Sequence, residues 1–203
     1  MSIPKIEGTG LARITNFVEW VDQNIVRAQW DNQRIENKYA NRTPREIIEE
    51  GNVFYMNPCL DLTLVYTALA NENGVGGNMV IEVYNAPSRL DFNPIHLAME
   101  FETEKGVVSV NHLGKEKVEI WPGAYKERVA AKRAMHPIRM PVQKINPDLP
   151  IHKSLGFKSR EECTRMFEGY SLRKHLDRMK QDNTLDNYSK FLESSRGFEI
   201  REV

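Results

Sequence analysis

Apolar residues recur with a helical period in the first third of the chain and alternate with polar ones afterwards. From Leu11 they return every three or four positions, and the stripe holds Ile14, Val18, Val21, Ile25 and Ala28. This period predicts an amphipathic helix that could extend from 11 to about 39. Thr43-Pro44-Arg45-Glu46 has the composition of a capping box, and Gly51 can end a helix. We therefore expect a second, short helix between Thr43 and Gly51.

The segment 57–70 is apolar on nearly every side, which is typical of a helix that is buried all round. Asn57 suits the capping position, Pro58 suits the first helical position, and Asn73-Gly74 gives the signal for the end. Cys59 would lie in the first turn, where unpaired N–H groups and the helix dipole favour a thiolate. The sequence thus predicts a central helix that presents Cys59 as a nucleophile. The alternative is an inert core cysteine, since cysteine is often buried.

Four later segments have the composition of strands, namely 78–84, 95–102, 107–111 and 117–121. Glu104-Lys105-Gly106 predicts a turn that joins the second and third of them as a hairpin. The segment 85–94 contains two prolines and predicts a loop. Helices followed by a run of strands indicate an α+β fold with an antiparallel sheet.

Beyond Tyr125 the chain is basic and rich in proline, which excludes a long helix across 126–158. We interpret this stretch as a solvated wrapping segment; the alternative is a patch for an acidic partner or nucleic acid. Ser159-Arg160-Glu161-Glu162 predicts the start of a helix that carries Cys163 in the core, and a last helix is expected over 184–194. We expect the core of the domain, with the N-terminal helices, to span 1–125. The wrapping segment and the C-terminal helices of the same domain would occupy 126–203.

Length and charge narrow the classes of protein that the chain can represent. Its 203 residues suffice for one domain with a proper core, and 28 basic residues balance 28 acidic ones. A balanced charge makes binding to nucleic acid or to an anionic membrane unexpected. No apolar run reaches the roughly 20 residues of a membrane span, and the N-terminus lacks the layout of a signal peptide. Two cysteines provide neither a disulfide framework nor metal-ligand spacing. We expect a cytoplasmic protein without a metal or an organic cofactor.

A thiol nucleophile needs a base, a group that orients the base, and donors for the oxyanion. His96 lies on the polar face of its strand, and Asn111 ends the second strand of the predicted hairpin. Antiparallel pairing brings that end back toward the start of the first strand. If the helix of Cys59 packs on this sheet with its N-terminus toward the same end, the three residues converge. His112 is a rival base on the opposite face of its strand, and the other histidines show no partner spacing.

This order of residues resembles the transglutaminase-like branch of the papain-like cysteine protease superfamily. In that branch a cysteine opens a buried helix, a glycine ends the helix, a strand follows, a histidine begins another strand, and an aspartate or asparagine closes the next. The matching positions are Cys59, Gly74, 79–83, His96 and Asn111, and the resemblance spans about 54–112. The chain departs from the pattern at 107–108, where the family often carries tryptophan and this sequence has two valines. Asn111 instead of aspartate can still orient a histidine but stabilises an imidazolium less.

The resemblance implies a papain/transglutaminase-like core and a thiol hydrolase or acyltransferase that attacks an amide or ester bond through acyl-Cys59. The substrate would be a peptide or a small amide or ester. By analogy, the backbone N–H of Cys59 and one donor from Asn52, Tyr55 or Asn57 would bind the oxyanion. The alternative is a catalytically inactive transglutaminase-like domain that binds a peptide or protein, with the C-terminal helices as the partner surface.

Overall fold

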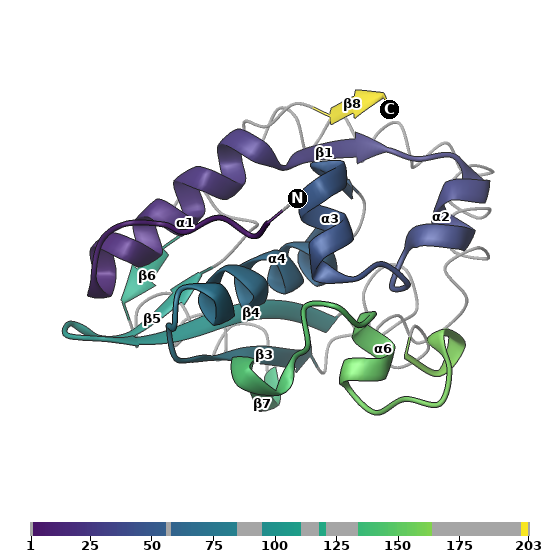
Figure 1. Ribbon diagram of the computed structural model, residues 1–203. Coiled ribbons are helices and arrows are strands. Elements are labelled where there is room, and N and C mark those ends of the chain that lie inside the picture. The colour runs from purple at the N-terminus through teal and green to yellow at the C-terminus, as the bar shows by residue number, and fades with distance from the viewer. Residues whose placement is uncertain are drawn as a thin grey trace.

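The protein has an α+β fold, as the sequence predicts (Figure 1). The computed structural model describes residues 2–55, 58–84, 95–110, 118–120, 134–163 and 200–202. The elements in chain order are α1 (Gly10–Asn24), β1 (Val26–Gln29), α2 (Asn32–Lys38), α3 (Pro44–Glu50), β2 (Asn52–Phe54), α4 (Pro58–Glu72), β3 (Gly77–Tyr84), β4 (Ile95–Thr103), β5 (Gly106–Val110), β6 (Val118–Ile120), β7 (Ala134–Pro141), η1 (Val142–Lys144), α6 (Ile151–Ser154) and β8 (Ile200–Glu202).

Two sheets organise the strands. The larger is antiparallel, with the order β6-β5-β4-β3-β7, so β4 is its central strand. Met99 of β4 lies opposite Met79 of β3 on one side and opposite Val110 of β5 on the other. This register confirms the predicted hairpin around Lys105. The smaller sheet is parallel, with the order β2-β1-β8, and it joins the N-terminal part of the chain to its C-terminal end.

Helix α4 lies in the centre of the molecule, between the antiparallel sheet and α3 (Figure 1). Every residue of 58–70 is buried, which confirms the expectation of a helix covered all round. The buried residues Leu97, Met99 and Phe101 alternate along β4, and the hydroxyl of Thr67 in α4 lies 3.6 Å from the sulfur of Met99. These residues therefore form the face of the sheet on which α4 packs.

The ends of α3 and α4 follow the signals in the sequence. The Thr43 hydroxyl accepts from the Glu46 backbone N–H at 3.1 Å, and the Glu46 carboxylate accepts from the Thr43 N–H at 2.7 Å. This is the predicted capping box. Gly51 follows α3 with a φ of +64°, and Gly74 follows α4 with the same φ, a left-handed conformation that glycine adopts at little cost.

The predicted single helix over 11–39 is interrupted after Asn24, and helical structure returns in α2 over Asn32–Lys38. After Asn24 the chain turns into β1, which pairs in parallel with β2 and β8. Ala28 and Trp30 are buried while Gln29 between them is exposed, and this alternation is that of a strand. The three-residue spacing of Ile25 and Ala28 fits a helix equally well. The partner strands decide the conformation, and they are distant in the sequence.

Strand β7 was not predicted, because its prolines were interpreted as a loose wrapping segment. β7 lies outside β3 and is the last strand on that side of the sheet among the described residues. Ile138 pairs with Ile81, whereas Met135 pairs with Val83, so β7 has one extra residue between these pairs. An edge strand with such a bulge tolerates proline. The prediction that prolines exclude a long helix here is correct over 134–163.

Several predictions fall on residues that the structure does not describe. They concern the cap Asn57, the loop 85–94, the part of the basic stretch over 126–133 and the C-terminal helices beyond Cys163. The start of the first of these helices is described: the Ser159 hydroxyl accepts from the Glu162 backbone N–H at 3.2 Å. In the part of the chain that is described, none of the helices is both long and apolar enough to cross a membrane.

Candidate functional site

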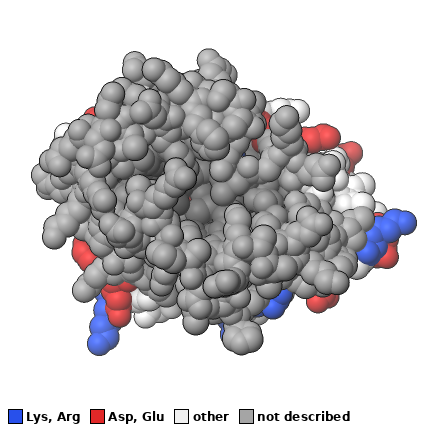
Figure 2. Space-filling view, turned by 180° about the vertical axis from the view of Figure 1, so that it is seen from behind, with Lys and Arg blue, Asp and Glu red and all other residues white. Residues whose placement is uncertain are grey.

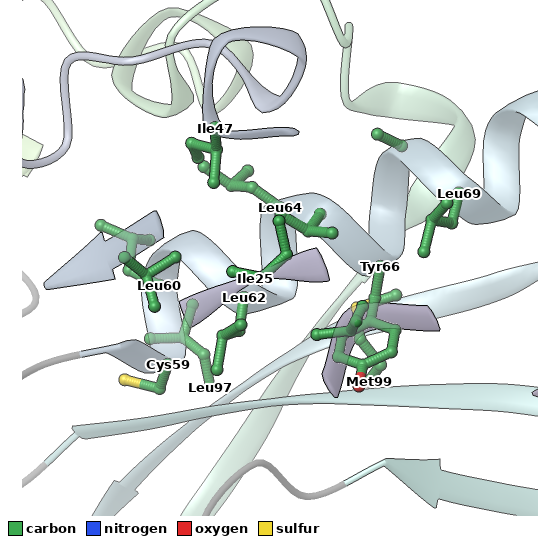
Figure 3. Close-up of a cluster of buried hydrophobic side chains, with 14 of the residues drawn as sticks. Ile25, Ile47, Cys59, Leu60, Leu62, Leu64, Tyr66, Leu69, Leu97 and Met99 are labelled. Carbon is green, nitrogen blue, oxygen red and sulfur yellow. The ribbon is translucent and has the colours of Figure 1, made fainter. Parts of the chain in front are cut away.

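Cys59 lies in the first turn of α4, and its side chain is 5% exposed. Cys59 lies beside Leu97 of β4 (Figure 3). The backbone of Leu97 hydrogen-bonds to the Cys59 thiol, as do those of Leu60 and Cys59 itself. The N-terminal end of α4 is therefore directed at the start of β4, as the convergence of Cys59 with His96 requires.

Burial raises the pKa of the Cys59 thiol to about 11, and the charge of Asp61 adds to this shift. The backbone hydrogen bonds to the sulfur lower this pKa, but by less than burial raises it. The expectation that the helix terminus favours a thiolate is therefore wrong for this arrangement. Loss of solvation at the sulfur outweighs the donors of the first turn. The group is a thiol at neutral pH.

His96 directly precedes Leu97 in β4 and lies opposite Glu82 of β3. His96, Ala98 and Glu100 alternate along β4 with the residues that pack on α4. The backbone thus places His96 next to the site of contact with the thiol, although the alternation of the strand favours the opposite face.

Asn111 lies outside the described residues. The described pairing of β4 with β5 ends where Val110 lies opposite Met99, three residues from His96. The meeting of Cys59, His96 and Asn111 in one triad stays a prediction.

A buried ion pair, which the sequence analysis missed, lies on another side of the first turn of α4. Arg42 and Asp61 are 2% and 1% exposed, and the guanidinium donates to the Asp61 carboxylate. Arg42 also donates to the Glu50 carboxylate at 3.1 Å and to the backbone carbonyl of Asn52 at 3.0 Å. Its guanidinium carbon lies 4.6 Å from the ring centroid of Trp30. An aspartate within an otherwise apolar helical stretch was the signal that could have pointed to this pair.

Glu50 links the pair to two further cations, Arg34 and Lys38. Partial burial acts to raise the pKa of Glu50, but Lys38 and Arg42 together hold it below its ordinary value. Burial raises the pKa of Asp61, and the charge and hydrogen bond of Arg42 offset this only in part. We call the residues joined by these contacts the Arg42 cluster; they are Trp30, Arg34, Lys38, Arg42, Glu50, Asn52 and Asp61.

The Arg42 cluster occupies one of the candidate oxyanion donors. The Asn52 side-chain oxygen accepts from the Trp30 indole N–H at 3.1 Å, and its amide donates to the Glu50 carbonyl at 2.8 Å. Asn52 is thereby engaged in the cluster. Tyr55 is 2% exposed, and Asn57 is not among the described residues.

The other described cysteine and a described histidine, Cys163 and His152, are both buried. Cys163 is fully buried in the core, as predicted. His152 is 7% exposed, and its Nδ1 lies 3.3 Å from the carbonyl oxygen of Ala40. Within the described residues, no group of three or more His, Cys, Asp or Glu side chains could hold a metal ion.

Charges of both signs are interspersed at the rim of the molecule, where basic and acidic side chains lie beside one another among the residues coloured in Figure 2. No protein-family model matches the chain, and a search of curated proteins finds no match. The resemblance to the transglutaminase-like branch therefore stays a prediction from the sequence.

Proposed function

We propose that the protein is a thiol-dependent hydrolase or acyltransferase with a papain/transglutaminase-like core, acting on an amide or ester bond. One observation carries the proposal. Cys59 lies in the first turn of a helix that is buried over 58–70, and its thiol meets the backbone of Leu97, the residue that follows His96 in β4. Acyl transfer through a thiol requires a base within reach of the sulfur, and His96 is the residue that we propose for this role.

In this mechanism His96 takes the proton of Cys59 while the sulfur attacks the acyl carbon. The carbon–sulfur bond forms, the bond to the amine or alcohol breaks, and His96 returns the proton to the leaving group. Water or an amine then attacks acyl-Cys59 and regenerates the thiol, with His96 acting again as base and acid. Asn111 orients the imidazole, and the Cys59 backbone N–H donates to the oxyanion. Because burial raises the thiol pKa, the proton transfer must accompany the attack.

Alkylation tests this proposal, with Cys163 as the reference inside the same chain. The protein is incubated with iodoacetamide across a range of pH, and the adducts are mapped by mass spectrometry. We expect selective modification of Cys59 below pH 7, and loss of this selectivity in His96→Ala. Equal and slow labelling of Cys59 and Cys163 would refute the proposal that Cys59 is a catalytic nucleophile.

The second candidate is a catalytically inactive transglutaminase-like domain that binds a peptide or protein. The raised pKa of the Cys59 thiol and the phase of His96 along β4 favour it. This candidate predicts that Cys59→Ala retains all function, since the thiol is only a core residue. Loss of a measured binding activity in Cys59→Ala, with the fold intact, would exclude it.

A further inference from the structure

The segment that precedes α1 lies against the C-terminal end of α4 without joining a helix or a strand (Figure 1). Side chains hold its backbone instead, and they come from α1 and from Asn73, the residue that follows α4. Main-chain hydrogen bonds to a fixed surface, with places for some side chains, are the means by which many proteins bind peptides. The contacts of this segment therefore have the form of a peptide-binding site.

The side chain of Asn73 binds the backbone on both sides of Lys5. Its amide donates to the Pro4 carbonyl at 3.1 Å, and its oxygen accepts from the Ile6 N–H at 2.7 Å. Two bonds of this kind fix the register of the bound chain whatever side chains it carries. The same amide donates to the Leu69 carbonyl at 2.8 Å, which anchors it on the last turn of α4. Asn73 is thus a recognition group that α4 itself holds in place.

The side chains of the bound segment form a pattern that this surface can select. Ile3 is 5% exposed and belongs to the apolar core, and Ile6 packs against that core. Lys5 lies between them with its ammonium 3.0 Å from the Glu72 carboxylate. Lys5 also donates to the Glu72 carbonyl, where the negative end of the α4 dipole favours a cation. The surface fits an apolar anchor, a basic residue two positions later and then a second apolar residue.

Two side chains of α1 extend this surface. Asn16 donates to the Glu7 carbonyl at 3.1 Å, and Arg13 donates to the Gly8 carbonyl at 2.6 Å. Arg13 also donates to the Asn73 carbonyl at 3.1 Å, so α1 and the end of α4 are joined where the segment lies. Both helices have buried residues of their own in the core, so the surface does not depend on the segment for its shape. We call its recognition groups the peptide seat; they are Arg13, Asn16, Glu72 and Asn73.

We propose that the peptide seat binds a peptide of another protein with the pattern apolar–any–basic–apolar, and that residues 3–6 occupy it as an internal ligand. Proline is accepted at the second position because that residue contributes only its carbonyl to Asn73. A segment attached to α1 competes at an effective concentration on the order of millimolar. A partner at micromolar concentration therefore binds when the internal segment is weakened. Binding at this place does not involve Cys59 and goes beyond the thiol chemistry proposed above.

Fluorescence anisotropy tests the site with a labelled peptide that has the sequence of residues 2–8. In the full chain, Ile3→Ser/Lys5→Ser keeps the seat but removes the anchor and the cation of the internal segment. We expect this variant to bind the peptide about tenfold more tightly than the wild type, because the site is open in a larger fraction of molecules. Adding Asn73→Ala should abolish the gain. A peptide with serine in place of Ile3 should not bind.

A charge reversal tests the basic position separately. In the Ile3→Ser/Lys5→Ser background, Glu72→Lys should weaken binding of the peptide and strengthen binding of a peptide with glutamate in place of Lys5. Each change should be roughly twofold to fivefold, since an exposed ion pair contributes little. Glu36→Lys reverses an exposed charge on α2 and is the matched control, which should alter neither affinity.

No binding of the peptide by folded Ile3→Ser/Lys5→Ser would overturn the proposal, and the segment would then be a fixed part of the core. If this variant does not fold, Lys5→Glu decides alone, because the Lys5 side chain is 73% exposed and a glutamate there repels Glu72. Peptide binding no tighter than that of the wild type would again contradict the proposal. A wild-type dimer that dissociates in Ile3→Ser/Lys5→Ser would show that a second copy fills the seat, and the assignment to another protein would be wrong.

Discussion

Replacing Arg42 by methionine leaves the Asp61 carboxylate in the core without its ion-pair partner. The side chains of both residues are only 2% exposed, so water cannot replace the lost contacts. Breaking a buried pair in this way costs about 3–5 kcal/mol, a large part of the roughly 5–15 kcal/mol by which domains are stable. The double variant Arg42→Met/Asp61→Leu removes both charges and should recover most of this loss.

The loss of stability in Arg42→Met should also depend on pH, and the structure determines the direction of this dependence. Burial raises the pKa of Asp61 and Arg42 lowers it, so Arg42→Met raises this pKa further. A carboxyl group whose pKa is raised in the folded state contributes stability below its unfolded pKa and loses it as the pH rises through the folded pKa. Glu50, whose pKa is lowered partly by Arg42, contributes in the opposite direction, and the substitution weakens that contribution. Both effects make Arg42→Met less stable at neutral than at mildly acidic pH, relative to the wild type.

Urea unfolding followed by circular dichroism at pH 5 and pH 8 measures both effects in the single and double variants. Arg45→Met is the matched control, because Arg45 forms an ion pair with Asp148 at the surface and its side chain is 37% exposed. Surface pairs of this kind contribute little. If Arg42→Met costs no more than Arg45→Met, or if the double variant is no more stable than Arg42→Met, the reasoning about the buried pair is wrong.

Three further predictions test the fold by the same urea assay. Gly51→Ala should lower stability more than Gly74→Ala, although both glycines have a φ of +64°. A Cβ at Gly51 would lie 3.2 Å from the Asn24 carbonyl oxygen, whereas a Cβ at Gly74 would have no other atom within 4 Å. Equal losses of stability would contradict this steric argument. Thr43→Ala should lower stability by about 1 kcal/mol through loss of the capping box, and Thr43→Ser should restore it. Glu104→Gln should cost about 0.3–1 kcal/mol, since the carboxylate accepts from the first turn of α1, and an unchanged unfolding midpoint would show that this charge contributes nothing.

The sequence predicts an element correctly where the conformation depends on a few neighbouring residues. The capping box of α3 and the Gly51 that follows it are examples. The apolar run of α4 and the turn at Gly106 likewise gave a buried helix and a hairpin at the predicted places.

Pairing between distant segments could not be predicted in this way. The strand β1 exists because β2 and β8 lie beside it, and its own four residues fit a helix as well. Arg42 precedes α3 and Asp61 lies in α4, and no local pattern in the sequence predicts that they pair. The place of Cys59 was predictable, but its pKa was not, since this depends on how completely the fold covers the sulfur.

The raised pKa of Cys59 finally decides what kind of thiol chemistry is possible. A thiol with a pKa of about 11 is a thiolate in roughly one molecule in ten thousand at pH 7. If this small population reacts directly, the alkylation rate should rise about tenfold per pH unit toward the pKa, and His96→Ala should leave it unchanged. If a base removes the proton during the attack, the rate should level off near the pKa of that base and fall in His96→Ala. The shape of the pH profile therefore separates a buried core thiol from a catalytic one, whatever the substrate is.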